Sequence, residues 1–360
     1  MVSARAIPVQ LTGHKYEILV QSGLYADAGA HLRKLSSSKK CALIADPNVP
    51  LPPALLASLQ KADFTIIASQ MPAGEKHKTI DTVSRLYDQL LRAGIERSTP
   101  ILALGGGVIG DTVGFVAATV LRGVPLVQIP TTLLAMVDAS VGGKTGVNHP
   151  VGKNLIGAFH QPIAVLIDPT VLKTLPPREL RSGLAECIKH DIIRDADGFA
   201  NLEQNIHRAL ALDMDYLTDL IAHNVAIKAK VVESDPFEKG ERAHLNFGHT
   251  FGHAIENVSG YSYAHGECVA LGMVAASRLA VSLKMLDQNS ADRIARLIAK
   301  AGLPTSGLKL SIDEVTKAML FDKKMKAGKV RFILPDRIGH VVIRDDVPEN
   351  LVRAALESLS

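Results

Sequence analysis

The sequence contains no tryptophan, and aromatic residues make up only 4% of its 360 residues. Proteins that bind single-stranded nucleic acid stack bases on aromatic side chains, so this scarcity argues against that class. An excess of one charge is missing as well, because 40 Lys and Arg face 36 Asp and Glu, a dispersed surplus of +4. General binding to phosphate backbones needs a concentrated positive surface. We therefore expect no nucleic-acid partner, whereas a local anion site is compatible with this composition.

Long apolar runs and paired cysteines are also missing. The longest apolar stretch, residues 269–283, is interrupted by Arg278 and falls short of a membrane span. The first ten residues lack the apolar core of a secretory signal. The cysteines, Cys41, Cys187 and Cys268, show no paired spacing, which predicts neither a disulfide framework nor a thiolate metal site. We expect a cytoplasmic protein that binds no membrane.

Short apolar runs alternate with segments of helical length over the first half of the chain. Two runs around Gly13 predict a hairpin. The predicted strands are 9–11, 18–20, 41–45, 64–68, 101–104, 124–129 and 164–167. This alternation is typical of a mostly parallel sheet with helices on both faces, in which ligands bind at the carboxyl ends of the strands.

The pattern changes after Leu175-Pro176-Pro177. Apolar residues then recur at spacings of three and four, with interruptions, from residue 179 to residue 301, which predicts a mainly helical region. Because Pro is tolerated at the first turn of a helix but not inside one, the Pro pair marks the boundary. We predict an α/β nucleotide-binding domain over 1–176, a mainly α-helical domain over 177–360, and an active site in the cleft.

A glycine-rich segment follows the predicted strand 101–104. Gly105-Gly-Gly-Val-Ile-Gly-Asp111 has the spacing G-x-G-x-x-G and runs into an apolar helix, as in loops that bind dinucleotide phosphates. Glycines let backbone amides approach a pyrophosphate, whose charge the helix N-terminus favours. The segment lies far from the first strand, so we do not expect a standard Rossmann topology. Asp46, after an earlier strand, is either the ribose acceptor or an ordinary turn former.

Three histidines have spacings that suit metal binding. His249 and His253 are four residues apart and therefore share a helix face, and His265 follows in His265-Gly-Glu267. With Glu186 as an oxygen ligand, one carboxylate and two imidazoles suit a catalytic zinc ion. Spacing leaves three interpretations of His249 and His253 open: both bind metal, one binds metal while the other transfers protons, or both only pack within the helix.

Basic residues cluster near glycine turns and near the metal candidates. They are Lys144, Lys153, Lys189, Lys228, Arg242, Lys323 and Lys324. Most charged residues are solvated surface groups, but this grouping favours a doubly anionic substrate over a neutral alcohol.

Four long motifs occur in one order along the chain, at 105–111, 130–146, 152–157 and 246–256. Together they resemble those of the 3-dehydroquinate synthase family, and the resemblance covers nearly the whole chain. It implies an NAD-binding α/β domain followed by a metal- and substrate-binding helical domain. It also implies NAD and Zn²⁺ as cofactors, with Co²⁺ as an alternative ion, and a homodimer that acts on a small-molecule substrate.

The family converts 3-deoxy-D-arabino-heptulosonate 7-phosphate to 3-dehydroquinate in the shikimate pathway. The resemblance implies that NAD oxidises the C5 hydroxyl, the ketone acidifies the neighbouring proton, and phosphate is eliminated. NADH then returns the hydride, and the enol closes the ring by aldol addition. A metal ion bound to the substrate hydroxyls would lower the pKa of the alcohol and polarise the transient carbonyl.

The resemblance also implies roles for individual residues. The metal ligands would be Glu186, His249 and His265. The catalytic candidates are His253, as the proton relay, with Lys144, Asn154, Asp138 and Lys189. The substrate-binding candidates are Arg122, which would reach a neighbouring subunit, Lys228, Arg242, Asn246 and either Lys323 or Lys324, of which we select Lys324. The NAD-binding candidates are Asp46, Asn48, Glu75, Lys78, Gly106, Gly107, Asp111, Thr131, Thr132, Lys153 and Thr174.

Three other classes of protein share parts of this pattern. A sister sugar-phosphate cyclase, of the inosose or valiolone synthase type, would lack carboxylate recognition, whereas Lys189, Arg242 and Asn154 match it. An iron-type or glycerol dehydrogenase would not need the basic cluster. A binding module without catalysis would leave the concentration of ionisable groups unexplained. Departures from the family at Cys187, His190 and residues 235–238 remove no ligand and concern local packing.

Overall fold

The computed structural model describes residues 4–260, 262–325 and 330–360, without the side chains of 320–325. The chain forms two units: unit 1 is Met1–Leu175 with Met214–Phe237, and unit 2 is Pro176–Asp213 with Glu238–Ser360. These units differ in one segment from the two predicted domains, 1–176 and 177–360. Helix α7 (Met214–Ser234) returns to unit 1 because it packs against strands β1 and β2.

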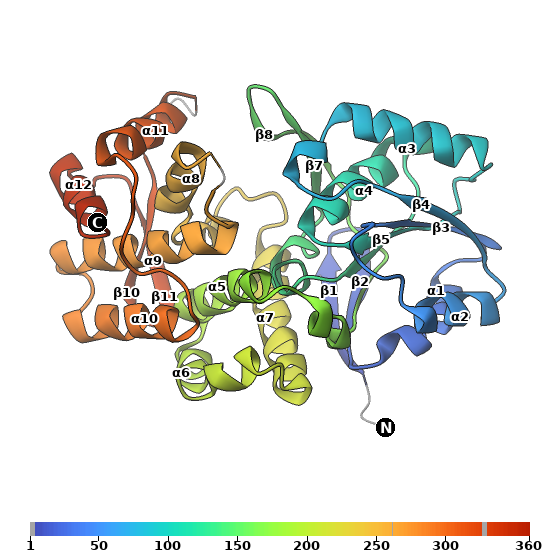
Figure 1. Ribbon diagram of the computed structural model, residues 1–360, viewed down its shortest axis with the longest axis horizontal. Coiled ribbons are helices and arrows are strands. Elements are labelled where there is room, and N and C mark those ends of the chain that lie inside the picture. Colours follow the sequence, from blue (N-terminus) through green and yellow to red (C-terminus); the bar gives the residue numbers. More distant parts are fainter. Residues whose placement is uncertain (1–3, 261, 326–329) are drawn as a thin grey trace. The chain divides into compact units, whose positions relative to one another are not determined.

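A seven-stranded sheet forms the centre of unit 1 (Figure 1). Its strands lie in the order β1 (Arg5–Leu11), β2 (His14–Val20), β9 (Ala164–Ile167), β6 (Leu126–Pro130), β5 (Ile101–Gly105), β3 (Lys40–Ala45) and β4 (Thr65–Gln70). All neighbours are parallel except the hairpin β1–β2. The mostly parallel sheet and its predicted strands are thus confirmed.

Helices cover both faces of this sheet because its central strands are apolar on both sides. Leu43 and Ala45 of β3 pack with α1 (Ala28–Leu35) and α2 (Pro53–Lys61). The alternate residues of the same strand pack with α3 (Ile80–Arg92) and α4 (Gly107–Thr119). Short helical turns complete the unit: η1 (Leu24–Ala26), η2 (Glu75–His77), η3 (Val120–Arg122), η4 (Ala135–Ala139) and η5 (Pro169–Thr174).

The strand order reverses between β3 and β5. From β3 the chain moves outward to β4 and then crosses back to add β5, β6 and β9 on the other side. This is the flavodoxin-like order of parallel strands and not the Rossmann order, as expected from the position of the glycine segment. Ligands of doubly wound sheets bind outside the carboxyl ends of the strands at such a reversal, so the residues that follow β3 and β5 are placed to bind one.

Two hairpins are absent from the sequence prediction. They are β7 (Lys144–His149) with β8 (Gly152–Phe159) in unit 1, and β10 (Phe332–Arg337) with β11 (His340–Arg344) in unit 2. Strand β8 lacks a fully buried face and exposes Leu155 and Phe159, so it has no hydrophobic alternation for a pattern search to detect.

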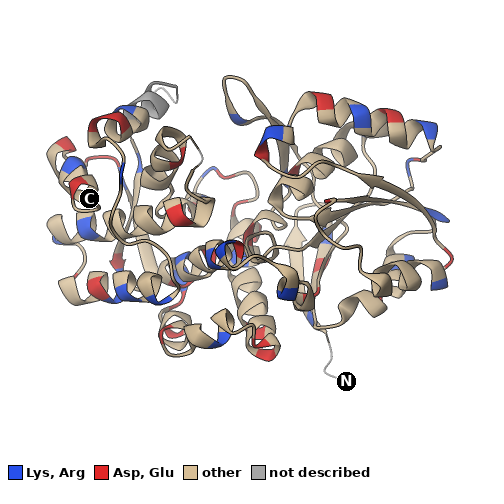
Figure 2. Ribbon diagram, viewed as in Figure 1, with Lys and Arg blue, Asp and Glu red and all other residues tan. Residues whose placement is uncertain are grey.

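Unit 2 is mainly helical, as predicted. Its helices are α5 (Pro177–Arg194), α6 (Ala196–Leu210), η6 (Glu241–Asn246), α8 (His249–Val258), α9 (His265–Ser282), α10 (Gln288–Lys300), α11 (Ile312–Met325) and α12 (Glu349–Glu357). Both signs of charge alternate along outer helices such as α3 of unit 1 (Figure 2). Across the described residues, no helix combines the length and the apolar character of a membrane span.

Glycines allow α8 and α9 to approach each other backbone to backbone. A Cβ atom on Gly272 would lie 1.9 Å from the carbonyl oxygen of Gly248, and one on Gly252 would lie 3.0 Å from that of Cys268. Gly248 itself has a φ of 77°, a left-handed conformation that other residues rarely adopt. This close packing brings the start of α8, with His249, alongside the first half of α9.

Substituting Gly272 tests this packing. Gly272→Ala should lower the midpoint of thermal unfolding by about 4–8 °C, because overpacking by about 2 kcal/mol outweighs the better helix propensity of alanine. Circular dichroism measures the midpoint. Ser282→Ala, at an exposed position on the same helix, should change it by less than about 2 °C. Equal midpoints for Gly272→Ala and the unsubstituted protein would contradict the proposed contact.

Candidate metal centre and nucleotide site

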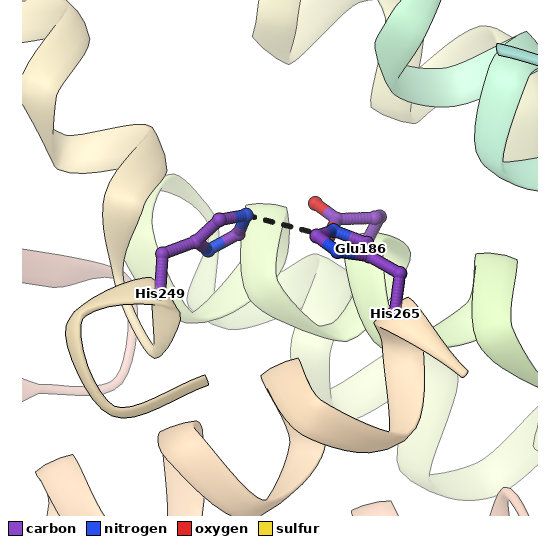
Figure 3. A group of neighbouring side chains, drawn as sticks. All are labelled: Glu186, His249 and His265. Carbon is purple, nitrogen blue, oxygen red and sulfur yellow. Dashed lines mark ion pairs between the residues drawn. The ribbon is translucent and has the colours of Figure 1, made fainter. Parts of the chain in front are cut away.

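Three side chains from three helices of unit 2 converge (Figure 3). Glu186 of α5, His249 of α8 and His265 of α9 each offer a donor atom within 4.8 Å of the others. The Nε2 atoms of His249 and His265 lie 3.9 and 3.5 Å from Oε1 of Glu186. These distances are too long for hydrogen bonds. They approach the separation of about 3.3 Å between two ligands of a tetrahedral zinc ion, so the donor set fits zinc.

Glu186 lies in the interior of unit 2, where a carboxylate needs a partner. Its side chain is 1% exposed, and Lys189, one helical turn later, forms an ion pair with its Oε2 atom. Residues three apart share a helix face, which lets these two side chains meet. Helix α5 is buried around its circumference here, since His190 and Cys187 are also inaccessible. Fully buried acids and bases are rare without such pairing, which marks this turn of α5 as a candidate for function.

The two candidate imidazole ligands differ in their surroundings. Nδ1 of His249 donates a hydrogen bond to the carbonyl of Phe247 at 3.1 Å, which leaves Nε2 with its lone pair for a metal ion. Burial and the nearby Lys189 lower the pKa of His249 well below its usual value, so the ring is neutral. For His265, burial disfavours the charged form, but the neighbouring carboxylates of Glu186 and Glu256 outweigh burial and raise its pKa to about 9.

His253 lies beside this centre without belonging to its donor group. Its ring centroid is 5.1 Å from that of His249 and 6.4 Å from that of His265. The donor atoms that lie within 4.8 Å of one another come from Glu186, His249 and His265, and His253 contributes none to this group. This arrangement favours the interpretation in which His249 binds metal and His253 transfers protons.

In unit 1 the glycine segment lies at the reversal of the sheet. Strand β5 ends at Gly105, and Gly106 and Gly107 begin α4. The amide of Asp46, directly after β3, donates to the carbonyl of Leu104 at 3.0 Å, so Asp46 lies next to this loop. Its carboxylate accepts a hydrogen bond from the amide of Asn48 at 2.9 Å, the contact of an Asx turn. The structure thus brings Asp46, Asn48, Gly106 and Gly107 to one edge.

The next strand adds two threonines to this edge. The amide of Thr131 donates to the carbonyl of Gly105 at 2.9 Å. A Cβ atom on Gly106 would lie 3.2 Å from Cγ2 of Thr132, so a larger residue would crowd the loop. Both threonines therefore lie against the candidate phosphate loop. The backbone amides of this loop lie at the N-terminus of α4, a position that favours a bound anion.

A polar network joins α4 to the hairpin β7–β8. Nζ of Lys78, which is 4% exposed, donates to Asp111 at 2.6 Å and also to Asn154. Asn148 donates to Glu75 at 2.7 Å and accepts from the amide of Asn154 at 2.9 Å. Lys153 lies 3.9 Å from Glu75. Asn148 connects the predicted residues but escaped the sequence analysis, since a lone Asn in a polar segment gives no distinctive signal.

A second buried lysine pairs with a predicted catalytic residue. Nζ of Lys228, on α7, donates to the carboxylate of Asp138 at 2.6 Å and to its backbone oxygen. Asp138 belongs to η4, a single turn of π-helix, a conformation that often occurs at functional sites. The pair adds a contact between α7 and η4 within unit 1, where Lys228 is 5% exposed.

The remaining predicted site residues belong to other parts of the two units. Arg122 and Leu121 both have positive φ angles, 66° and 51°, a strained pair before Gly123. The hydroxyl of Thr174 donates locally to Val171, and Lys144 is exposed at the start of β7. In unit 2, Arg242 is 2% exposed, and Asn246 donates to Glu238 at 3.1 Å. The side chains of Lys323 and Lys324 lie outside the described part of the chain.

Comparison with known proteins identifies similar sequences and folds. The models of the 3-dehydroquinate synthase N-terminal and C-terminal domains match residues 68–182 and 183–325. A 3-dehydroquinate synthase from Synechococcus sp. strain PCC 6301 is 50% identical, with 98% of each chain covered.

Two solved structures share the fold over nearly the whole chain. One is a 2-epi-5-epi-valiolone synthase from Streptomyces hygroscopicus subsp. jinggangensis 5008 with NAD⁺ and Zn²⁺ bound, with a TM-score of 0.88, 31% identity and 96% of each chain covered. The other is a 2-deoxy-scyllo-inosose synthase complexed with carbaglucose-6-phosphate, NAD⁺ and Co²⁺, with a TM-score of 0.89 and 25% identity. The alignment covers 99% of this chain and 100% of that one.

Paired substitutions test which histidines hold the metal. His265→Ala should weaken zinc binding by at least about a hundredfold, because it removes one of three donors. His253→Ala, its matched control, should keep stoichiometric zinc while losing turnover. Zinc content after dialysis and competition with a chromophoric chelator measure this, with circular dichroism to verify folding. Stoichiometric zinc in His265→Ala would eliminate that residue as a ligand.

The candidate ribose acceptor is tested by calorimetry. Asp46→Ala should weaken NAD binding about 10- to 100-fold, the loss expected for hydrogen bonds to a charged group. Asp88→Ala, at an exposed position of α3, should leave the dissociation constant unchanged. Equal NAD affinity in the two variants would show that Asp46 only forms the turn and does not bind the ribose.

Proposed function

The chain belongs to the 3-dehydroquinate synthase family, and we propose that it converts 3-deoxy-D-arabino-heptulosonate 7-phosphate to 3-dehydroquinate and phosphate. The observation that carries the proposal is the convergence of Glu186, His249 and His265 in a chain whose two halves both match this family. The cofactors are NAD and a divalent metal ion, Zn²⁺ or Co²⁺, as in the related cyclases.

The reaction is an internal redox cycle around an elimination. When bound, NAD supplies a reversible hydride acceptor, and the metal ion supplies a Lewis acid for the substrate alcohol. The C5 hydroxyl is oxidised to a ketone, which acidifies the proton on the neighbouring carbon. That proton and phosphate leave, the same hydride returns to C5, and the opened enol closes the ring by aldol addition. No net oxidation results.

The residues of unit 2 hold the metal ion and move the proton. Glu186, His249 and His265 are its ligands, and Lys189 balances the buried charge of Glu186. His253 receives the proton of the C5 hydroxyl, a role that its position beside His249, outside the donor group, supports.

The residues of unit 1 hold NAD and part of the substrate. Asp46 and Asn48 bind the ribose, and Gly106, Gly107 and the threonines after β6 bind the pyrophosphate, a role supported by their position at the sheet reversal. The cofactor contacts extend to the network of Glu75, Lys78, Asp111 and Lys153, and to Thr174. Asp138, held by Lys228, lies near the reacting hydroxyl.

Cationic and amide groups recognise the two anionic ends of the substrate. Arg122, Lys144, Asn154 and Lys228, with Arg242, Asn246 and Lys324, divide between its phosphate and its carboxylate. Recognition of a carboxylate distinguishes this substrate from the neutral sugar phosphates of the sister cyclases. The homodimer and the cytoplasmic location stay predictions from the sequence.

Phosphate release from chelator-treated protein tests the proposed reaction. With the heptulosonate phosphate as substrate, release should require both NAD and zinc, and absorbance at the wavelength of NADH should not grow during turnover. Phosphate release in the absence of NAD, or in the absence of zinc, would contradict the internal redox cycle. A steady increase in the absorbance of NADH would indicate a dehydrogenase.

Alternative substrates separate the sister cyclases. Glucose 6-phosphate and sedoheptulose 7-phosphate should release no phosphate, because neither carries the carboxylate. Release from one of them, together with no release from the heptulosonate, would assign the chain to a sister activity and overturn the carboxylate assignments.

A further inference from the structure

We propose that Arg178 and Glu267 form a clamp that holds His265 in position as a metal ligand. The clamp joins the first turn of α5, the helix that carries Glu186, to the first turn of α9, the helix that begins with His265. The inference rests on the metal centre of the proposed function. It assigns neither clamp residue to the ligand set.

The guanidinium of Arg178 donates two parallel hydrogen bonds to the carboxylate of Glu267. Nε donates to Oε1 at 2.8 Å, and Nη2 donates to Oε2 at 2.7 Å. Nη2 also donates to the carbonyl of Ser262 at 3.0 Å, in the segment that leads into α9. An isolated surface ion pair contributes little to the free energy of folding. A bidentate pair in which the guanidinium also binds a third acceptor fixes the orientation of its partners and the distance to them. Three acceptors near the start of α9 are therefore tied to α5.

Glu267 also closes the first turn of its own helix. Its Oε2 atom accepts a hydrogen bond from the amide of Ala264 at 2.8 Å, the residue directly before His265. This contact satisfies a backbone donor at the N-terminus and fixes the backbone on which His265 stands.

A second contact between α5 and α9 lies between the clamp and Glu186. The amide of Gly266 donates to Oγ of Ser182 at 2.9 Å. A Cβ atom on Gly266 would lie 2.3 Å from the carbonyl oxygen of Ser182, so only glycine fits this approach. Ser182 and Glu186 are four residues apart and share a face of α5, which places His265 next to Glu186. The clamp therefore acts at the same junction of α5 and α9 that brings Glu186 and His265 together.

Zinc affinity of the metal-free protein tests the clamp directly. Glu267→Ala should raise the zinc dissociation constant about 10- to 100-fold, the usual cost of losing an outer contact to a metal ligand. Arg178→Ala and Arg178→Lys should raise it similarly, because lysine keeps the charge but lacks the planar fork. Glu267→Gln should fall between Glu267→Ala and the unsubstituted protein, since its amide oxygen still accepts from Ala264. The double variant Arg178→Ala/Glu267→Ala should bind zinc no more than about twofold more weakly than Glu267→Ala alone.

A matched control separates positioning from general stability. Asp346→Ala breaks a bidentate pair of similar geometry, with Arg344 at 2.6 and 2.7 Å, elsewhere in unit 2. It should leave zinc affinity unchanged. All variants are compared at a temperature at which circular dichroism shows them folded. The visible spectrum of bound Co²⁺ gives a second readout, which should change with Glu267→Ala and not with Asp346→Ala.

Two results would overturn the clamp alone: zinc affinity and Co²⁺ spectrum unchanged in Glu267→Ala, or an equal loss of affinity in Asp346→Ala. If the unsubstituted protein itself binds no zinc, the metal centre of the proposed function fails and the clamp fails with it. The measurement thus distinguishes the two failures without recourse to turnover.

Discussion

The candidate metal centre depends on how closely, and with which residues facing one another, three helices of unit 2 approach. Its donor side chains lie on α5, α8 and α9, so they meet only if these helices pack side by side. Glycine makes this approach sterically allowed at the contacts of Gly272 with Gly248 and of Gly266 with Ser182. The same positions lower intrinsic helix stability. The packing of the unit around α9 must therefore supply the stability that the glycines do not.

Buried charge is the second constraint, and both units meet it in the same way. In unit 2 the interior carboxylate of Glu186 pairs with Lys189. In unit 1 the interior ammonium groups of Lys78 and Lys228 pair with Asp111 and Asp138. Such pairs are poor sources of net stability because desolvation offsets their attraction. Their occurrence at the carboxyl edge of the sheet and beside the candidate metal donors agrees with the proposed chemistry on an anionic substrate.

The elements with strong local patterns were predictable. Apolar runs located every strand of the large sheet, and the first segment of unit 1 ends at Leu175, directly before the Pro pair. The hairpin β7–β8 was missed because it lacks a buried alternating face. The return of α7 to unit 1 was missed for a different reason. A helical pattern shows that a segment has an apolar face, but not which sheet or bundle that face will cover.

The residue types and spacings of the candidate site can be read from the chain alone: the glycine loop after β5, the histidines four residues apart, and Glu186 with Lys189 one turn later. These are local properties, decided by helix and strand periodicity within a few residues. The packing of helices in unit 2 brought His265 to His249 and Glu186, whereas His253 lies outside this donor group. It also brought Arg178 to Glu267. Contacts between segments far apart in the chain depend on how helices pack, and no periodicity within one segment encodes its partner.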